Sequence, residues 1–218
     1  MESPYDCYLK LPDLLALQCP RTAEESSAQW ADEHFFIAVH QSAEVLAGQA
    51  LVDLRTLQQA PPVDHHCVLA CLRRVSAVVG LLEQHLALLE HLPRDSFAAF
   101  RPLLDDASGA QSSQFAELFC MIDRCAQDAE RAGGETADAG AEASGAQGAL
   151  DGGEAAQAWW RLRSAVSLWR TRHLMLVEWL IGDRPGTGGT SGLAYLRSRI
   201  DLPPRGPVEG PDHGGRRH

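Results

Sequence analysis

The chain has 218 residues and a formal net charge of −10, and 45% of its residues are apolar whereas only 6% are aromatic. This length predicts one domain with a substantial core, which we place at residues 1–202, followed by a disordered tail at 203–218. The negative charge argues against nucleic acid or an anionic membrane as the main partner. The many Leu and Ala residues favour helices.

Three features bear on the compartment. The sequence contains no run of about 20 apolar residues, so we expect no segment that spans a bilayer. The amino terminus lacks the basic region and apolar core of a signal peptide, which predicts a cytoplasmic protein. The six cysteines are scattered through apolar helical patterns rather than spaced as a disulfide framework, so we expect reduced thiols.

An apolar arm and a long helix are predicted first. The arm covers residues 5–18, and its larger side chains include Tyr5, Tyr8 and Leu9. After a polar stretch, a helix is predicted over about 32–57, with a broad apolar stripe that contains Phe36 and His40. A lone histidine on an apolar stripe is more often a core residue than a functional one.

A second long helix is predicted over 63–92, where apolar residues recur at spacings of three and four. We interpret it as bundle core, and its residues His85 and His91 as structural or exposed. A short helix over 96–104 follows, in which Arg101 is surrounded in sequence by apolar residues. A guanidinium in such a place either pairs with a buried acid or binds an anionic ligand.

The carboxy-terminal half contains three further predicted helices and one linker. Residues 132–155 are Gly, Ala and acidic residues with almost nothing to bury, which predicts a flexible linker. The helices are expected at about 114–131, 156–181 and 193–200.

A glycine-rich stretch, GTGGTSG at 186–192, follows the helix that carries Trp169 and His173. It has no lysine before its last hydroxyl residue, so it is no Walker loop, and a helix rather than a strand precedes it, which excludes a dinucleotide fingerprint. A mobile loop that folds over a ligand remains, and it would offer backbone N–H groups and hydroxyls such as that of Thr187.

Four motifs together resemble those of the tryptophan 2,3-dioxygenases, which are haem enzymes. The closest is Trp-x-x-x-His at 169–173 with the GTGGTSG loop. The pattern DE-x-x-F-I-x-x-H-Q-x-x-E at 32–44 resembles the distal side of the haem. Phe-x-x-Phe-Arg at 97–101 precedes Ser-Gly-Ala-Gln-Ser at 108–112, and Tyr-x-x-Tyr-Leu lies at 5–9.

The resemblance implies an all-α helical bundle that encloses a b-type haem. His173 would be the axial ligand of the iron, and Ser108, Gly109, Trp169 and Gly188 would lie at the cofactor. His40 would be the catalytic residue on the opposite side, where it accepts a hydrogen bond from the indole nitrogen instead of binding iron.

The family also implies how a small aromatic amino acid would be held. Phe36 and Phe97 would sandwich the indole ring, while Arg101 and Thr187 would hold the amino-acid end. The family inserts its amino-terminal segment into the neighbouring subunit's pocket, which assigns Tyr5, Tyr8 and Leu9 to substrate binding. We therefore expect a homo-oligomer, either a dimer or a tetramer.

The implied reaction uses molecular oxygen to cleave the indole C2–C3 bond of L-tryptophan or a derivative, which gives an N-formylkynurenine-type product. Ala110 stands where the family has phenylalanine, and the family's middle helices and closing carboxy-terminal segment have no counterpart, so we expect a shortened, specialised member. One alternative is a haem monooxygenase of the same superfamily that forms an oxindole. A second is a haem-binding sensor without catalysis, against which Arg101 together with Thr187 argues.

Overall fold

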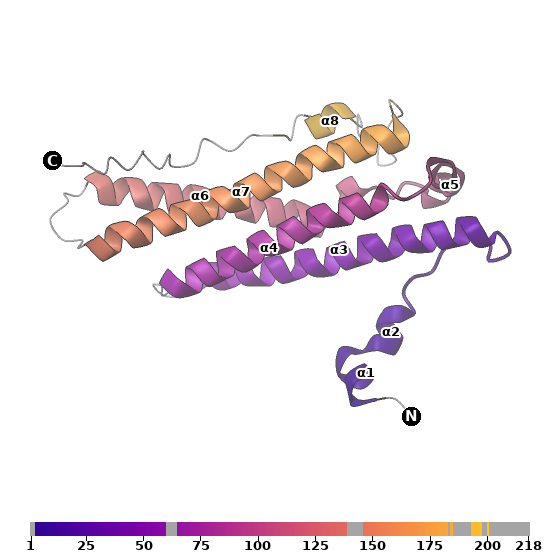
Figure 1. Ribbon diagram of the computed structural model, residues 1–218, viewed down its shortest axis with the longest axis horizontal. Helices are drawn as coiled ribbons and strands as arrows, with labels where there is room; N and C mark the ends of the chain where they lie inside the picture. The colour runs from indigo at the N-terminus through magenta and orange to yellow at the C-terminus, as the bar shows by residue number, and fades with distance from the viewer. Residues whose placement is uncertain are drawn as a thin grey trace, which may run out of the picture.

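The computed structural model describes residues 3–59, 65–138, 146–182, 184, 193–197 and 200. Four long helices lie side by side in an elongated bundle (Figure 1). They are α3 (Ser27–Gln59), α4 (His65–Leu89), α6 (Ser113–Asp138) and α7 (Ala146–Ile181). No strand occurs within the described ranges, which confirms the predicted all-α class.

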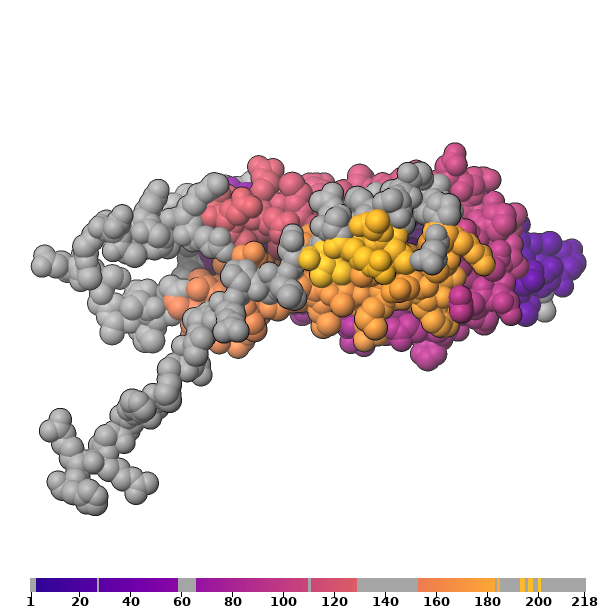
Figure 2. Space-filling model, turned by 90° about the horizontal axis from the view of Figure 1, so that it is seen from above, coloured from indigo at the N-terminus to yellow at the C-terminus, as the bar shows by residue number. Residues whose placement is uncertain are grey.

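Shorter helices flank the bundle. They are α1 (Pro4–Leu9), α2 (Leu11–Leu15), α5 (Arg94–Phe100), the 3₁₀ helices η1 (Arg101–Leu104) and η2 (Gly109–Gln111), and α8 (Leu193–Arg197). The α6 helix runs beside α7 on one face of the molecule, and α8 packs on α7 (Figure 2). Pro93, with extended backbone, is the N-cap residue of α5, so this helix begins two residues earlier than the predicted start at 96, and α4 ends at Leu89 rather than at 92.

The core fills the space between the four long helices. Leucine and valine side chains at spacings of three and four place one apolar face of each helix inward. Eight of these residues, two from each helix, are almost fully buried: Leu51, Leu54, Leu72, Val75, Leu118, Ile122, Leu162 and Val166.

Buried charge also joins the helices. The carboxylate of Asp53 on α3 is 3% exposed and accepts two hydrogen bonds from Arg74 on α4, at 2.5 and 2.6 Å. Arg172 on α7 pairs with Glu83 and Glu90 on α4, and so ties α7 to α4 beside His173. Such charge-assisted bonds fix the register of neighbouring helices more firmly than apolar contact alone.

The amino-terminal arm, α1 with α2, stands away from the bundle (Figure 1). Ser3 and Asp6 form a capping box that starts α1, and Lys10 adopts the left-handed conformation (φ 54°) between the two helices. Glu33 on α3 holds the base of the arm, because its buried carboxylate accepts the backbone N–H groups of Arg21 and Thr22 at 3.0 and 2.7 Å.

The helices extend further into the expected linker than its composition predicts. The α6 helix continues to Asp138 and α7 begins at Ala146, so both ends of 132–155 are helical. Alanine has the highest helix propensity, and here it outweighs the glycines. Residues 139–145 and the expected tail at 203–218 lie outside the described residues.

One helix, α3, is long and apolar enough over Ala28–Gln58 to cross a membrane by length and composition alone. The core helix of a water-soluble bundle passes the same test. In this protein the helix contributes Leu51 and Leu54 to the centre of the core and carries the buried carboxylates of Glu33 and Asp53.

Candidate active site

The fold brings His40 of α3 and His173 of α7 to the same cavity. This small hollow, of about 100 Å³, is lined by both histidines, by Glu44 and by apolar side chains such as Val39 and Leu86. His40 is close enough to His173 to contribute to the lowered pKa of His173. Two imidazoles from distant parts of the sequence thus face one largely apolar space.

His173 is neutral at physiological pH. Burial, and next to it the proximity of His40, lowers the pKa of His173 to about 4. Its ring stacks on that of Trp169, one helical turn earlier, with the centroids 5.0 Å apart and an interplanar angle of 26°. A metal ligand must be a deprotonated imidazole of fixed orientation, and both conditions hold at His173.

His40 is oriented by its own helix. Its Nδ1 lies 2.7 Å from the carbonyl oxygen of Phe36, and since a carbonyl can only accept, Nδ1 carries the proton. The other ring nitrogen, Nε2, is then an acceptor. Part of the His40 ring is exposed to solvent, but protein atoms surround most of it, and this burial lowers the pKa of His40. The hydrogen bond to Phe36 and the negative charge of Glu44 oppose the shift.

A large hollow of about 520 Å³ adjoins the small one on the side of α6. The two hollows share one wall, made by Gly109, Ser112, Phe115, Trp169 and His173. Volumes of several hundred Å³ are typical of sites for small molecules and cofactors. His173 therefore stands at the junction between a site large enough for a cofactor and the cavity that contains His40.

An aromatic cluster continues from His40 toward α5. The ring of Phe36 lies 4.1 Å from that of His40, 5.8 Å from that of Phe97 and 5.5 Å from that of Phe100. Phe97 and Phe100 meet edge to face at 5.4 Å. The sequence predicts that Phe36 and Phe97 sandwich an indole ring. Here their rings contact each other directly at 5.8 Å, with Phe100 beside them, and neither residue lines the two hollows.

Comparison with known proteins identifies the family. The family described as tryptophan 2,3-dioxygenase matches residues 1–127. Proteins named tryptophan 2,3-dioxygenase from Anaeromyxobacter dehalogenans (strain 2CP-C) and Anaeromyxobacter sp. (strain K) are 31% and 30% identical to this chain, each over 249 positions that cover 91% of this chain and 91% of the relative. One from Nocardioides sp. (strain ATCC BAA-499 / JS614) is 30% identical over 247 positions.

The chain belongs to the tryptophan 2,3-dioxygenase family. This confirms the resemblance and makes the protein a haem-dependent oxygenase. The alignments to the Anaeromyxobacter proteins run over more positions than the 218 residues of this chain. The chain therefore lacks residues that these tryptophan 2,3-dioxygenases possess, in agreement with the expected shortening.

In a tryptophan 2,3-dioxygenase family protein, the residues around the two hollows fit a haem. A neutral imidazole at His173 suits iron, and Leu82, Leu86 and Leu89 offer apolar surface to a porphyrin. Gly109 and Trp169, which the resemblance assigns to the cofactor, line both hollows. Ser108 is next to Gly109 but lines neither hollow. Its backbone N–H donates a hydrogen bond to the side chain of Gln111 at 3.0 Å.

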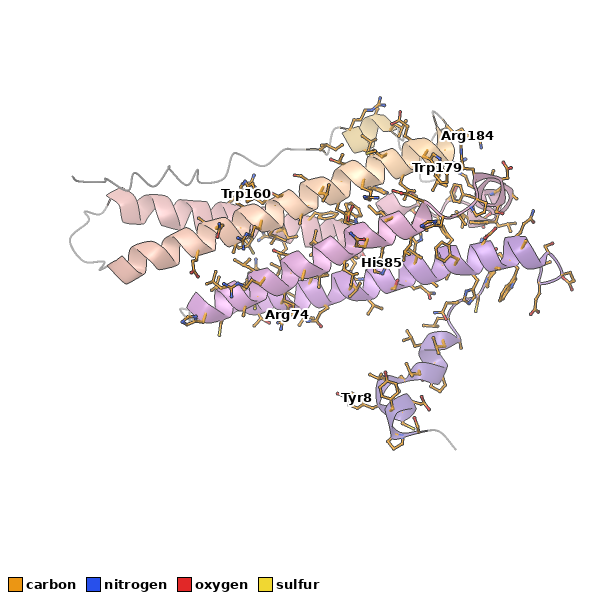
Figure 3. The ribbon with its side chains drawn as sticks, in the orientation of Figure 1. Tyr8, Arg74, His85, Trp160, Trp179 and Arg184 are labelled. Atoms are coloured by element: carbon orange, nitrogen blue, oxygen red, sulfur yellow. The ribbon has the colours of Figure 1, made fainter. Side chains whose placement is uncertain are left out.

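The remaining predicted site residues lie in different places. Arg101 is half-buried in η1, directly after Phe100 of the aromatic cluster. Thr187 and Gly188 lie outside the described residues. The side chains of Tyr5, Tyr8 and Leu9 are 66%, 86% and 41% exposed on the arm, so a single chain does not bring them to its own hollows (Figure 3).

Sequence patterns do not identify one residue that lines the small hollow and two that lie behind it. His85, which the sequence predicts to be structural or exposed, lines the small hollow, half-buried, with Nδ1 2.8 Å from the carbonyl oxygen of Leu81. Gln114 of α6 donates to the backbone carbonyl and side chain of Glu44 at 2.9 and 2.8 Å, and so braces the helix turn after His40. Gly48 permits this contact, because a Cβ there would lie 2.8 Å from Gln114 Oε1.

Proposed function

We propose that the protein is a haem b dioxygenase that cleaves the indole C2–C3 bond of L-tryptophan, or of a tryptophan derivative, to an N-formylkynurenine-type product. One observation carries the proposal: in a chain of this family, neutral His40 and His173 face the same apolar cavity from opposite helices. The proposed setting is the cytoplasm.

His173 would hold the haem iron, with Gly109 and Trp169 against the porphyrin and with Ser108 and Gly188 close by. The bound haem would supply the oxygen chemistry, with molecular oxygen as co-substrate. The role of the chain is then to keep His173 neutral and oriented. The stack on Trp169 and the ion pairs of the adjacent Arg172 to α4 serve that purpose.

The substrate ring would lie against the aromatic cluster beside His40. Nε2 of His40 is an acceptor and would take a hydrogen bond from the indole N–H, while Phe36 and Phe97 wall the ring. Arg101 would bind the substrate carboxylate through its planar fork, together with Thr187. These contacts select an aromatic amino acid and orient its ring.

The pocket would be completed by a second copy of the chain. The arm presents exposed apolar side chains, and a surface of that kind is normally covered by a partner. We propose a homo-oligomer, a dimer or tetramer, in which Tyr5, Tyr8 and Leu9 of one chain enter the substrate pocket of its neighbour.

The decisive experiment supplies the haem-loaded, reduced protein with L-tryptophan and isotopically labelled oxygen and records the product mass. A gain of two labelled oxygen atoms supports the dioxygenase. No turnover of tryptophan or of its ring-substituted derivatives would contradict it.

A second candidate is a haem monooxygenase that forms an oxindole from a substituted tryptophan. The observation that favours it is the shortened chain, with Ala110 in the box where the family has the larger phenylalanine. A gain of one labelled oxygen in the same experiment would select this reaction.

A further inference from the structure

The two hollows differ in their charge. The small hollow is lined by one carboxylate, Glu44, by the histidines His40, His85 and His173, and by apolar side chains. The large hollow is lined by two guanidinium groups, Arg124 and Arg170, and one carboxylate, Asp123. A ligand that spans both would therefore meet positive charge at its α6 end and apolar or negative surface at the other.

Arg170 is the more deeply placed of the two arginines. Its side chain is only 15% exposed, and it lies one helical turn before His173 on α7. The guanidinium carbon lies 5.1 Å from the centroid of Phe119. The carboxylate of Asp123 is half-exposed, and its Oδ2 lies 3.7 Å from Nη2 of Arg170, which is too far for a direct hydrogen bond. Among the residues that the structure describes, Arg170 thus has hydrogen-bond donors to spare for an anionic ligand.

Arg124 reaches the same hollow from the opposite wall. It belongs to a face of α6 on which Phe119, Cys120, Asp123, Arg124 and Gln127 all line the cavity. These residues recur at helical spacing and form one continuous face of α6, on which Arg124 is exposed and lines the same hollow as Arg170 of α7. Two cations on facing helices suit a ligand that carries two neighbouring anions.

Haem b is such a ligand, because its two propionate carboxylates lie on one edge of an otherwise apolar ring. We propose that Arg170 and Arg124 bind the haem propionates and so set the orientation of the porphyrin in its own plane. The apolar edge would then point toward Val39, Leu86 and Leu89 of the small hollow, and the two propionates would stay away from the like charge of Glu44 in that hollow. The inference rests on the proposed function, since it requires that the protein bind haem.

The inference gives Arg170 a purpose that its present contacts do not. A guanidinium that is largely removed from solvent is stabilised by a carboxylate at hydrogen-bond distance, and a propionate would supply one. Since Arg170 and His173 lie one turn apart on α7, one rigid helix would hold both the iron and the acidic edge of the ring.

The test compares two forms of the same porphyrin. The apoprotein is titrated with hemin and with hemin dimethyl ester, whose propionates are masked, and dissociation constants are read from the absorbance change. The variants are Arg170→Gln and Arg124→Gln, with Arg161→Gln on an exposed part of α7 as the matched control. Circular dichroism establishes that each variant is folded, and Arg170→Lys restores the charge.

We expect Arg170→Gln to weaken hemin binding at least tenfold and Arg124→Gln to weaken it less, with unchanged affinity for the dimethyl ester. Arg170→Lys should recover most of the loss, and Arg161→Gln should change neither affinity. Equal losses for hemin and its ester, or no loss, would overturn this inference while haem binding itself stands. Failure of the unmodified protein to bind hemin would overturn the proposed function as well.

Discussion

The bundle and the amino-terminal arm use similar apolar residues in opposite ways. In the bundle, leucines such as Leu118 and Leu162 are fully buried, whereas Leu15 and Leu17 of the arm are 69% and 61% exposed. The bundle buries a large apolar core within one chain, although residues such as Leu168 and Met175 stay exposed, whereas α1 and α2 bury no residue at all. The difference teaches that one chain supplies the contacts that stabilise the bundle, whereas it supplies few that cover the apolar side chains of the arm.

The largest effect is expected from the bundle. His173→Ala removes the proposed iron ligand, so haem should be lost or weakly held and turnover should fall by about a thousandfold or more, as for loss of a residue essential to the reaction. Absorbance of the purified protein measures haem content. Stoichiometric haem with an unchanged spectrum in this variant would refute the assignment.

Arg101→Ala tests the proposed ion pair between Arg101, next to the aromatic cluster, and the substrate carboxylate. Removal of one partner of a charge pair in a dry pocket typically costs about 2–5 kcal/mol, so the KM for L-tryptophan should rise by two to three orders of magnitude with normal haem content. Tryptamine, which lacks the carboxylate, should be a poor substrate for the unmodified protein and should be affected little by the substitution. Normal turnover of tryptophan by Arg101→Ala would remove this clamp from the mechanism.

Deletion of residues 1–10 separates the two regions directly. Since no residue of α1 or α2 is buried, the bundle should keep its circular dichroism and its melting temperature should change little. Light scattering should show a smaller assembly, and turnover should fall about tenfold or more because the neighbour's pocket is incomplete. An intact protein that is monomeric at micromolar concentration would contradict the proposed role of the arm.

Two leucine truncations compare the regions by stability. Leu118→Ala opens a cavity in the core and should lower the free energy of unfolding by about 2–5 kcal/mol. Leu15→Ala on the exposed arm should change the unfolding of an isolated chain by less than about 0.5 kcal/mol. Chemical denaturation of dilute, monomeric samples measures both values. A large effect at Leu15 would mean that the arm packs on its own bundle.

The smallest effect concerns pH. The pKa of His173 falls from 6.5 to about 4 on folding, and that of His40 is also lowered, so the unfolded apoprotein binds more protons than the folded one within this window. Stability should be full above pH 6.5 and decline as the pH falls toward 4. His173→Gln, which cannot titrate, should flatten the decline in thermal melts.

The hydrogen bonds that hold the base of the arm to Glu33 should break at a lower pH than the one at which the bundle begins to lose stability. Burial alone would raise the pKa of Glu33, but the hydrogen bonds from Thr22 and Arg21 lower it below its usual 4.5. Its contribution is therefore present above about pH 4.5 and is lost as the pH falls through the lowered value. Protease susceptibility of the arm should stay constant at pH values where the bundle already weakens. Release of the arm before the bundle loses stability would reverse this order.

Local patterns in the sequence predict the helices and which of their faces point inward. Apolar spacing of three and four predicted each long helix, and Pro93 marked one boundary, because these signals act within a few residues. Motifs also predicted His40, Phe36 and Phe97 on one side of a site and His173 on the other. The composition of 132–155 predicts a flexible linker, whereas α6 and α7 both extend into it. Composition alone does not show whether the helix propensity of alanine outweighs the flexibility of glycine.

Which helix faces pack against each other is seen only in the tertiary structure. Periodicity says which side of a helix turns inward, but not which helix lies opposite, since that depends on how side chains interlock and on long-range ion pairs. Packing places Phe115 of α6 on Trp169 and brings His85 to the small hollow beside His40. It also sets Arg170 across from α6, in a cavity that no local signal in the chain foretells, because a cavity belongs to the space between helices.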